Sequence, residues 1–217
     1  FKGMNYPSYW IGQYAAPMSG TQLDEIKAMY ANYVAIVPGW FLNNKTNSTI
    51  RSNATRTAPS YEVNQAIDDA HFRGLKVLLK PHVDMLDGSF RGAIAPANTN
   101  TWFLSYRRYM TNMARIAQQK GAEAFCIGTE LDKTLPHERE QRELIAAVRA
   151  VYPGLLTYAA NWTHFEEVPF WDALDVIGVS FYAPLAEQPT RDASVLRAGA
   201  ARVLAGLRVK FPRVRAP

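Results

Sequence analysis

The sequence of 217 residues is poor in cysteine and has no long apolar run. Cys126 is the only cysteine, so the chain can form neither an internal disulfide framework nor a cysteine-based zinc site. Within the apolar run 124–127 we expect its thiol to be buried. No segment approaches the roughly 18 consecutive apolar residues of a membrane-spanning helix. We therefore predict no membrane partner.

Motifs that mark nucleotide sites and serine hydrolases are also missing. No Gly-x-Gly-x-x-Gly or Walker loop follows the first apolar run, which argues against a nucleotide-binding fold. No Gly-x-Ser-x-Gly nucleophile elbow occurs, so a Ser-His-Asp hydrolase has little support. The sequence predicts no cofactor.

The positive net charge of +5, with a pI near 9.3, is concentrated late in the chain. Seven basic residues account for the excess: Arg191, Arg197, Arg202, Arg208, Lys210, Arg213 and Arg215. They follow a predicted helix and a tail, without interleaved aromatic residues or a nucleic-acid-binding motif. We favour a solvated helix face over a phosphate-binding patch and predict no nucleic-acid partner.

Short β-rich apolar runs alternate with amphipathic helical stretches along the chain. The predicted strands are 2–6, 33–37, 75–80, 124–128, 155–159 and 175–181. Apolar faces at helical spacing predict five helices. The first begins at Thr21 and carries Leu23, Ile26 and Tyr30, and the second begins at Ser60 and ends at Gly74. The others cover 102–117, 144–151 and 194–209, and long loops are predicted at 38–59 and 82–100.

Near-continuous apolar strands separated by helices predict a parallel sheet covered on both faces. Six βα units in order favour a (β/α)8 barrel over a doubly wound sheet. A full barrel of this kind takes about 250 residues. We therefore expect one domain, residues 1–217, of the α/β class: an incomplete TIM barrel with about six βα units.

Such a barrel carries its active site at the C-terminal ends of its strands. Polar and aromatic residues gather at those positions, which predicts a sugar site where aromatic faces stack on pyranose rings and polar groups bind hydroxyls. The substrate-binding candidates are Tyr6, Trp10, Trp40, Lys80, His82, Asp84, Asn161, Trp162 and Tyr182. The three tryptophans could instead cap the barrel core.

Glu130 is the acid/base candidate because of its position. It directly follows the apolar run 125–128, where partial desolvation favours the protonated form of a carboxyl group. A protonated carboxyl can donate to a glycosidic oxygen near neutral pH. A surface glutamate at the start of a loop is the alternative that this position leaves open.

His82 and Asp84 form a His-x-Asp pair that could ligate a metal. Two ligands make an incomplete set, and the remaining histidines offer no matching cluster. We therefore predict no metal and expect both side chains to bind sugar or brace the site. Tyr182 is the best hydrogen-bond partner for a second carboxylate.

Four segments of the chain carry a family resemblance. They are 2–5 (Lys-Gly-Met-Asn), 79–84 (Leu-Lys-Pro-His-Val-Asp) with Asp-Gly at 87–88 and Arg-Gly at 91–92, 128–131 (Gly-Thr-Glu-Leu), and 171–182 (Trp-Asp-Ala-Leu-Asp-Val-Ile-Gly-Val-Ser-Phe-Tyr). Together they resemble glycoside hydrolase family 113, which are β-mannanases in the large clan of retaining (β/α)8 hydrolases. The resemblance covers essentially the whole chain, in order.

The resemblance implies that Glu130 is the general acid/base, and it adds Arg91 to the substrate-binding candidates. It implies a retaining endo-β-1,4-mannanase, whose partner is a β-linked polysaccharide or oligosaccharide such as mannan or glucomannan. In such enzymes a second carboxylate, about 5–5.5 Å from the first, forms a glycosyl-enzyme intermediate.

The nucleophile is where the chain departs from the family pattern. In the clan it is a glutamate after the seventh strand, but residues 211–217 stand where that strand should begin. No glutamate follows Glu167 except Glu187, in a loop, so we assign the nucleophile to no residue. Six units leave two apolar sheet edges open. We therefore expect the isolated chain to self-associate through these edges and to lack mannanase activity.

Two other functions stay open at this point. A non-catalytic carbohydrate-binding barrel would keep the aromatic face without the nucleophile, and a metal-dependent hydrolase would use His82 and Asp84. The chain opens at Phe1 without a signal peptide, so we expect it to have been trimmed. The compartment is left open, with a secreted or periplasmic location favoured.

Overall fold

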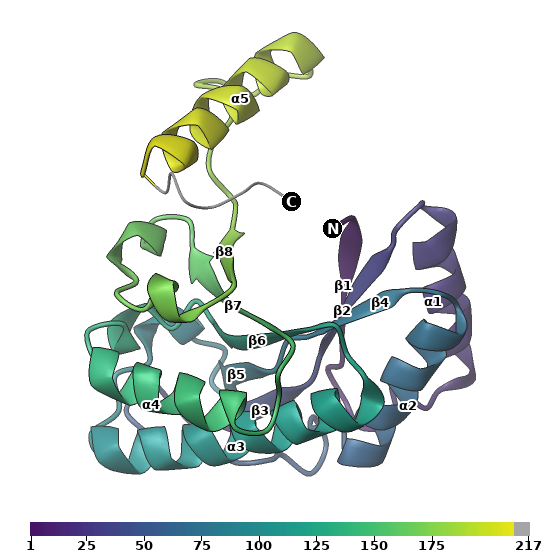
Figure 1. The fold of residues 1–217 in the computed structure, drawn as a ribbon, viewed down its shortest axis with the longest axis vertical. Helices are drawn as coiled ribbons and strands as arrows, with labels where there is room; N and C mark the ends of the chain where they lie inside the picture. The colour runs from purple at the N-terminus through teal and green to yellow at the C-terminus, as the bar shows by residue number, and fades with distance from the viewer. Residues whose placement is uncertain (211–217) are drawn as a thin grey trace.

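The main sheet of the protein is parallel and follows chain order. The computed structural model describes residues 1–210, with side chains described through residue 206. The sheet consists of β1 (Gly3–Pro7), β2 (Tyr33–Val37), β4 (Lys76–Leu79), β6 (Ala124–Thr129), β7 (Leu155–Asn161) and β8 (Val176–Ser180). Figure 1 shows it as a curved sheet with helices outside. This is the incomplete (β/α)8 barrel that the sequence predicts.

Five α-helices accompany the described strands: α1 (Pro17–Ala28), α2 (Ser60–Phe72), α3 (Thr99–Lys120), α4 (Glu138–Arg149) and α5 (Ala193–Lys210). The predicted apolar faces of α2, α3 and α4 are buried, with Ile67, Trp102 and Leu144 at most 1% exposed. Gly74 follows α2 with a φ of 68°, the left-handed conformation that commonly ends a helix. None of the helices within residues 1–210 is both long and apolar enough to cross a membrane.

The prediction for the first helix was wrong at both ends. The helix α1 begins at Pro17, not at Thr21, because the fixed φ of proline suits the first helical turn. Tyr30 lies beyond its C-terminal end, with a φ of 59° and 89% of its surface exposed. Leu23 and Ile26 are buried as expected.

Two predicted loops each contain a short strand. The strands β3 (Gly39–Leu42) and β5 (His82–Met85) pair in parallel and extend the lines of β2 and β4. Pro38 lies between β2 and β3, and Pro81 lies between β4 and β5. The strands are interrupted there because a proline has no N–H to donate to a neighbouring strand. The His82 N–H donates to the Pro38 carbonyl at 2.9 Å. His82 and Asp84 therefore lie on a strand, where side-chain direction is fixed by alternation.

The core lies between the sheet and the helices. Cys126 and Ile127 are buried in β6, as predicted. The Tyr106 hydroxyl of α3 donates to the Ile127 carbonyl. The Trp102 ring packs on the Tyr106 ring, with centroids 4.7 Å apart and planes tilted by 31°. These contacts fix α3 against the strand that precedes Glu130.

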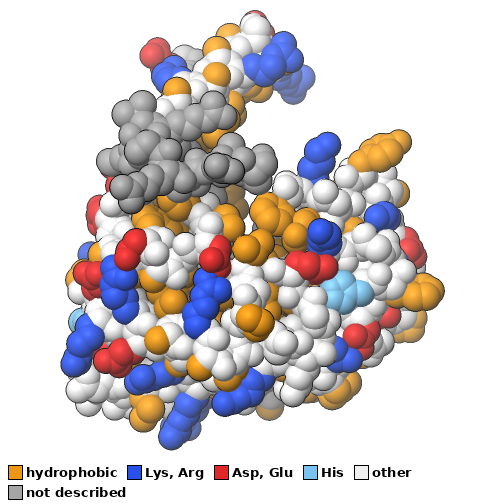
Figure 2. Space-filling view, in the orientation of Figure 1, with side chains coloured by type: hydrophobic (Ala, Val, Ile, Leu, Met, Phe, Trp, Pro, Cys, Tyr) orange, Lys and Arg blue, Asp and Glu red, His pale blue; other side chains and the backbone are white. Residues whose placement is uncertain are grey.

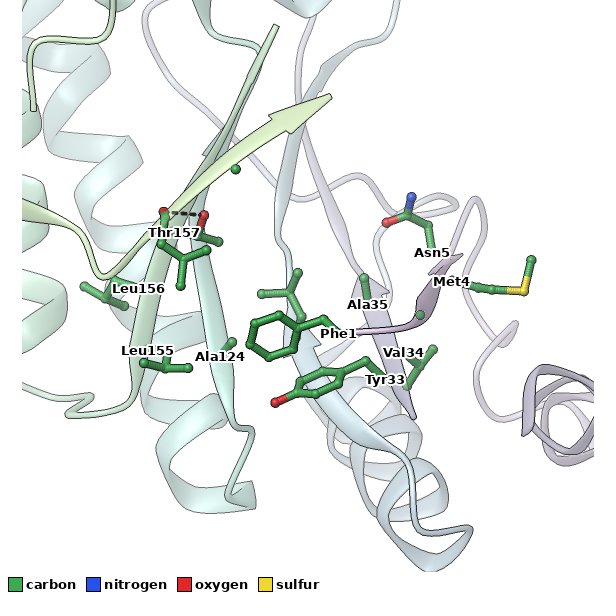
Figure 3. A pocket seen from close by; sticks show the side chains of 14 residues that line it. Phe1, Met4, Asn5, Tyr33, Val34, Ala35, Ala124, Leu155, Leu156 and Thr157 are labelled. Carbon is green, nitrogen blue, oxygen red and sulfur yellow. Dashed lines mark hydrogen bonds between the residues drawn. The ribbon is translucent and has the colours of Figure 1, made fainter. Parts of the chain in front are cut away.

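An apolar cavity of about 350 Å³ lies toward the N-terminal ends of the strands. Figure 3 shows the Phe1 ring between Tyr33 and the strand that carries Ala124. The Phe1 and Tyr33 rings meet edge to face, with centroids 4.5 Å apart. The other residues that line the apolar cavity are mostly aliphatic, including Val34, Leu78 and Leu156. It is barrel interior rather than a polar site, because inward-facing strand residues fill the centre of such a barrel.

Charges of both signs are mixed along α3 and α4, as the blue and red side chains of Figure 2 show. Arg107 of α3 pairs with Glu143 of α4 at 3.5 Å. Among the late basic residues, Arg191, Arg197 and Arg202 are exposed. The side chains of Arg208 and Lys210, and the whole of Arg213 and Arg215, lie outside the described part of the chain.

Candidate active site

A polar cleft of about 740 Å³ opens at the C-terminal ends of the strands. It lies at the opposite end of the sheet from the apolar cavity, where a barrel enzyme carries its active site. Six predicted site residues line it: Lys80, His82, Asp84, Arg91, Glu130 and Tyr182. Residues from β1, β3, β5, β6 and β8 or the loops after them therefore converge on one space.

Strand alternation removes Tyr6 and Trp40 from this lining. Asn5 and Pro7 face the cleft, so Tyr6 between them points the other way, and its hydroxyl bonds Ser19 Oγ at 2.9 Å. Trp40 likewise lies between two cleft-lining residues of β3 and stacks on Tyr109, with centroids 4.7 Å apart. Both predicted substrate contacts are corrected: Tyr6 and Trp40 brace the barrel.

The remaining predicted residues lie around the cleft rather than in its lining. Trp10 is 57% exposed, and its neighbour Tyr9 lines the cleft. Asn161, at the end of β7, donates from Nδ2 to Asp132 Oδ2 at 3.3 Å. Trp162 follows it, half-buried and outside the lining.

Glu130 occupies a strained position at the end of β6. Its φ is 52°, in the left-handed region that costs a residue other than glycine roughly 1–3 kcal/mol. The Glu130 N–H donates to the Ala159 carbonyl at 2.8 Å, and the next N–H, of Leu131, donates to the Tyr158 hydroxyl at 2.8 Å. These bonds hold the backbone turn that directs the carboxylate into the cleft, where the side chain is 14% exposed.

Arg91 links the two carboxylates of the cleft. Its Nη2 atom lies 2.6 Å from Asp84 Oδ1, and its Nη1 atom lies 3.5 Å from Glu130 Oε2. The same Asp84 Oδ1 atom accepts a hydrogen bond from Arg91 Nε at 2.8 Å. Two nitrogens of the guanidinium therefore meet one charged oxygen, so Asp84 orients the cation that faces Glu130.

His82 is held neutral in this setting. Burial, and then the positive charges of Arg91 and Lys80, lower the pKa of His82 well below its usual range. Its Nδ1 atom lies 4.0 Å from Asp84 Oδ2, and its buried Nε2 atom has no hydrogen-bond partner among the described residues. A neutral imidazole can donate at one nitrogen and accept at the other.

The cleft does not resemble a metal centre. Within the described residues, no three His, Cys, Asp or Glu side chains gather closely enough to hold a metal ion. Arg91 also engages the Asp84 carboxylate, and a guanidinium competes with a cation for the same oxygens. The His82–Asp84 pair therefore gives the metal-dependent hydrolase no structural support.

Several cleft residues were not among the predicted contacts. Tyr9 and Phe90 add aromatic rings, and Arg56 and Ser180 add polar groups. Phe90 could have been predicted as a site residue, since it is an aromatic residue in a polar, glycine-containing loop, 87–92. Arg56 comes from the long loop before α2, and nothing in its local sequence indicates where that loop folds.

The family model and the two solved structures compared first point to the same family. The model of Glycoside Hydrolase Family 113 matches residues 7–203. A GH113 β-1,4-mannanase complex superposes with a TM-score of 0.84 at 27% identity, covering 96% of this chain and 68% of its own. The GH113 β-mannanase of Alicyclobacillus acidocaldarius, in complex with ManMIm, gives 0.81 at 31% identity, covering 93% and 66%. The chain thus spans about two thirds of these relatives.

More distant similarity concerns the fold alone. A GH5_18 protein of Streptomyces cattleya, in complex with Manb1-4GlcNAc, is 16% identical with a TM-score of 0.53. A search of the curated proteins finds no match. With the family model matching most of its length, and Glu130 in a polar cleft at the C-terminal end of a parallel barrel sheet, the chain belongs to glycoside hydrolase family 113.

Proposed function

We propose that the protein hydrolyses β-1,4-linked mannan, glucomannan and their oligosaccharides, with Glu130 as the general acid/base of a retaining reaction. The observation that carries this is the placement of Glu130, largely shielded from water in the cleft and 3.5 Å from Arg91. The similar GH113 structures are β-mannanases, which supports the choice of sugar.

Glu130 would act once in each of two steps. In the first, its protonated carboxyl donates to the oxygen of the leaving sugar while a second carboxylate attacks the anomeric carbon. In the second, the Glu130 carboxylate takes a proton from the water that releases the glycosyl-enzyme. Arg91 faces Glu130 at 3.5 Å, so its positive charge stabilises the carboxylate formed after the first step.

The other predicted residues would bind the sugar. Lys80, His82, Asp84, Arg91 and Tyr182 line the cleft and offer donors and acceptors to hydroxyl groups. Trp10, which is exposed and adjacent in sequence to the cleft-lining Tyr9, would stack on a sugar ring outside the cleft. Asn161 and Trp162 would contribute from the end of β7, Asn161 by orienting Asp132.

A second candidate function is sugar binding without turnover. Retaining hydrolysis needs a nucleophilic carboxylate about 5–5.5 Å from the acid/base. Among the described residues that line the cleft, Asp84 is the only carboxylate besides Glu130, and Arg91 already holds it. We therefore assign the nucleophile to no residue of the chain.

The test uses a full-length parent that also supplies the nucleophilic carboxylate and compares its wild type with Glu130→Gln on β-1,4-mannan. Released reducing ends measure turnover, and calorimetry measures binding. We expect turnover to fall by about 10²–10⁴-fold, the usual contribution of a general acid, with affinity for mannohexaose nearly unchanged. Glu143→Gln, an exposed carboxylate of α4, is the control.

Each outcome decides between the candidates. If Glu130→Gln turns over mannan at the wild-type rate, Glu130 is not the acid/base. Binding of mannohexaose without any turnover by the wild type supports the second candidate. Failure of the wild type to bind manno-oligosaccharides removes both.

A further inference from the structure

The loop between β1 and α1, residues 8–16, carries two exposed aromatic residues. Tyr9 lines the cleft, and the neighbouring Trp10 ring has its centroid 6.3 Å from that of Tyr9. Tyr9 is 64% exposed and Trp10 57% exposed, so neither ring is packed into the core. The positions of both rings therefore depend on what holds the backbone of this aromatic loop.

The middle of the aromatic loop is held from outside. The Ile11 N–H donates to the Thr55 carbonyl at 2.9 Å, and the Gly12 N–H donates to Glu62 Oε1 at 2.8 Å. Gly12 has a φ of 87°, a conformation that glycine adopts without the strain that other residues meet. Glu62 therefore fixes the loop at its most permissive residue, two positions after Trp10.

The effect of this anchor reaches Tyr9 through Gln13. Gln13 Oε1 accepts the Tyr9 N–H at 2.8 Å, and its Nε2 atom donates to the Pro7 carbonyl at 2.9 Å. Gln13 directly follows Gly12 in the chain. A displacement of Gly12 would therefore be passed to the backbone that carries the Tyr9 ring.

Glu62 is a fully buried carboxylate in the first turn of α2. Its Oε1 atom also accepts from the Tyr61 hydroxyl at 3.3 Å, whereas its Oε2 atom has no hydrogen-bond partner among the described residues. The positive end of the helix favours a carboxylate there, but a buried oxygen without a partner costs free energy. Glu62 takes no part in the proposed reaction and, being buried, cannot touch a sugar in the cleft.

We propose that Glu62 is a positioning residue for the substrate: by holding Gly12 it sets where Tyr9 and Trp10 meet the sugar. The proposal rests on the proposed function. Glu62 acts only through the aromatic loop, so its removal should weaken sugar binding only while the two rings are present. A residue that merely stabilised the fold would show no such dependence on the rings.

The test is a double-mutant cycle on binding, which needs no nucleophile and therefore uses the chain itself. Mannohexaose is titrated by calorimetry into the protein with Glu130→Gln, then with Glu62→Ala added, with Tyr9→Ala and Trp10→Ala added, and with all of them together. We expect Glu62→Ala to weaken affinity by about five- to tenfold, within what one or two aromatic contacts contribute. Without the two rings, Glu62→Ala should change affinity by less than about twofold.

A conservative variant and a matched control complete the set. Glu62→Gln keeps a carbonyl oxygen that can accept the Gly12 N–H, so its affinity should stay within about twofold of the parent. Glu123→Ala removes another carboxylate that accepts a backbone N–H, that of Val77 at 2.7 Å, at the start of β4 and away from the cleft. This control should lose stability in urea and keep its affinity for mannohexaose.

The outcomes separate the positioning role from the function on which it rests. Unchanged affinity in Glu62→Ala, an equal loss with and without the two rings, or an equal loss in Glu62→Gln would overturn the positioning role alone. Absence of mannohexaose binding in the parent with Glu130→Gln would overturn the positioning role and the proposed function together.

A second variant applies if Glu62→Ala does not fold. A Cβ atom at Gly12 would meet nothing within 4 Å, so Gly12→Ala strains only the left-handed backbone of the aromatic loop. It should weaken mannohexaose binding, and the loss should again disappear without the Tyr9 and Trp10 rings. A loss that persists without them, or no loss at all, would overturn the positioning role.

Discussion

The backbone conformation of Glu130 determines where its side chain points. A left-handed φ of 52° is unfavourable for glutamate, and the hydrogen bonds of its own N–H and of the following N–H compensate for it. As a result, the Glu130 side chain does not follow the alternating directions of the β6 side chains and points into the cleft. A glutamate in regular strand geometry would be constrained to one face of the sheet.

His82 gives a prediction about pH. Its folded-state pKa is lowered, so below the unfolded value of about 6.5 the unfolded chain binds a proton that the folded chain does not. The free energy of unfolding should therefore fall as pH drops below about 6.5, by up to about 1.4 kcal/mol per pH unit from this group. Urea unfolding from pH 7.5 to 5 should show a shallower fall in His82→Asn. Identical slopes in both proteins would show that His82 is not held neutral.

The β6–α4 connection is held as a unit by Tyr158. Its buried hydroxyl accepts the Leu131 N–H, and the Leu131 carbonyl accepts from Thr134 Oγ1 at 2.9 Å. Thr134 Oγ1 in turn accepts from Gln141 Nε2 of α4 at 3.2 Å. The loop that presents Glu130 is thereby tied both to β7 and to the helix that follows.

Tyr158→Phe should lower activity through this connection without touching substrate. Removing the hydroxyl leaves the Leu131 N–H without a partner, which should cost about 1–3 kcal/mol of stability and let Glu130 shift. Tyr152→Phe is the matched control, because its buried hydroxyl donates to the Ala122 carbonyl at 2.7 Å, before β6 begins. Made in a full-length parent that supplies the nucleophile, both variants should lose stability by urea unfolding, but only Tyr158→Phe should lose kcat. Equal kcat in the two variants would contradict the role of Tyr158.

Open sheet edges lead to a prediction about the whole molecule. In the described sheet β1 and β8 each pair with one neighbour, β2 and β7, and the apolar cavity lies between them. Edge strands of this kind pair with other chains. The isolated 217-residue polypeptide should show a light-scattering mass above 24.3 kDa that rises with concentration. Val179→Lys on β8 should reduce it, and a constant monomer mass for the unmodified chain would contradict the prediction.

Much of the architecture could be predicted from the sequence, because apolar periodicity is a local signal. The strand β6 and the buried face of α3 follow directly from it. The short strands β3 and β5 could not be predicted, since each follows a proline and pairs only across the fold. The directions of the Tyr6 and Trp40 side chains could not be predicted either. The end of each strand could be located from the sequence, but not which of two neighbouring residues faces the cleft.

Residues brought together by tertiary structure were the hardest to predict. Asp84, Arg91 and Glu130 come from three segments, and their contact through one guanidinium has no local signature. Asp132 carries no motif of its own and becomes notable only through its burial and its unpartnered oxygen.

The role of Glu130 is tested most directly by the dependence of Glu130→Gln on the leaving group. In a full-length parent that supplies the nucleophile, the variant and the wild type are compared on β-1,4-mannan and on a dinitrophenyl β-mannoside, whose leaving group needs no protonation. We predict a loss in kcat/KM of about 10²–10⁴-fold on mannan, with little loss in formation of the glycosyl-enzyme from the activated substrate. An equal loss on both substrates, or no loss on mannan, would contradict the assignment of Glu130 as the general acid.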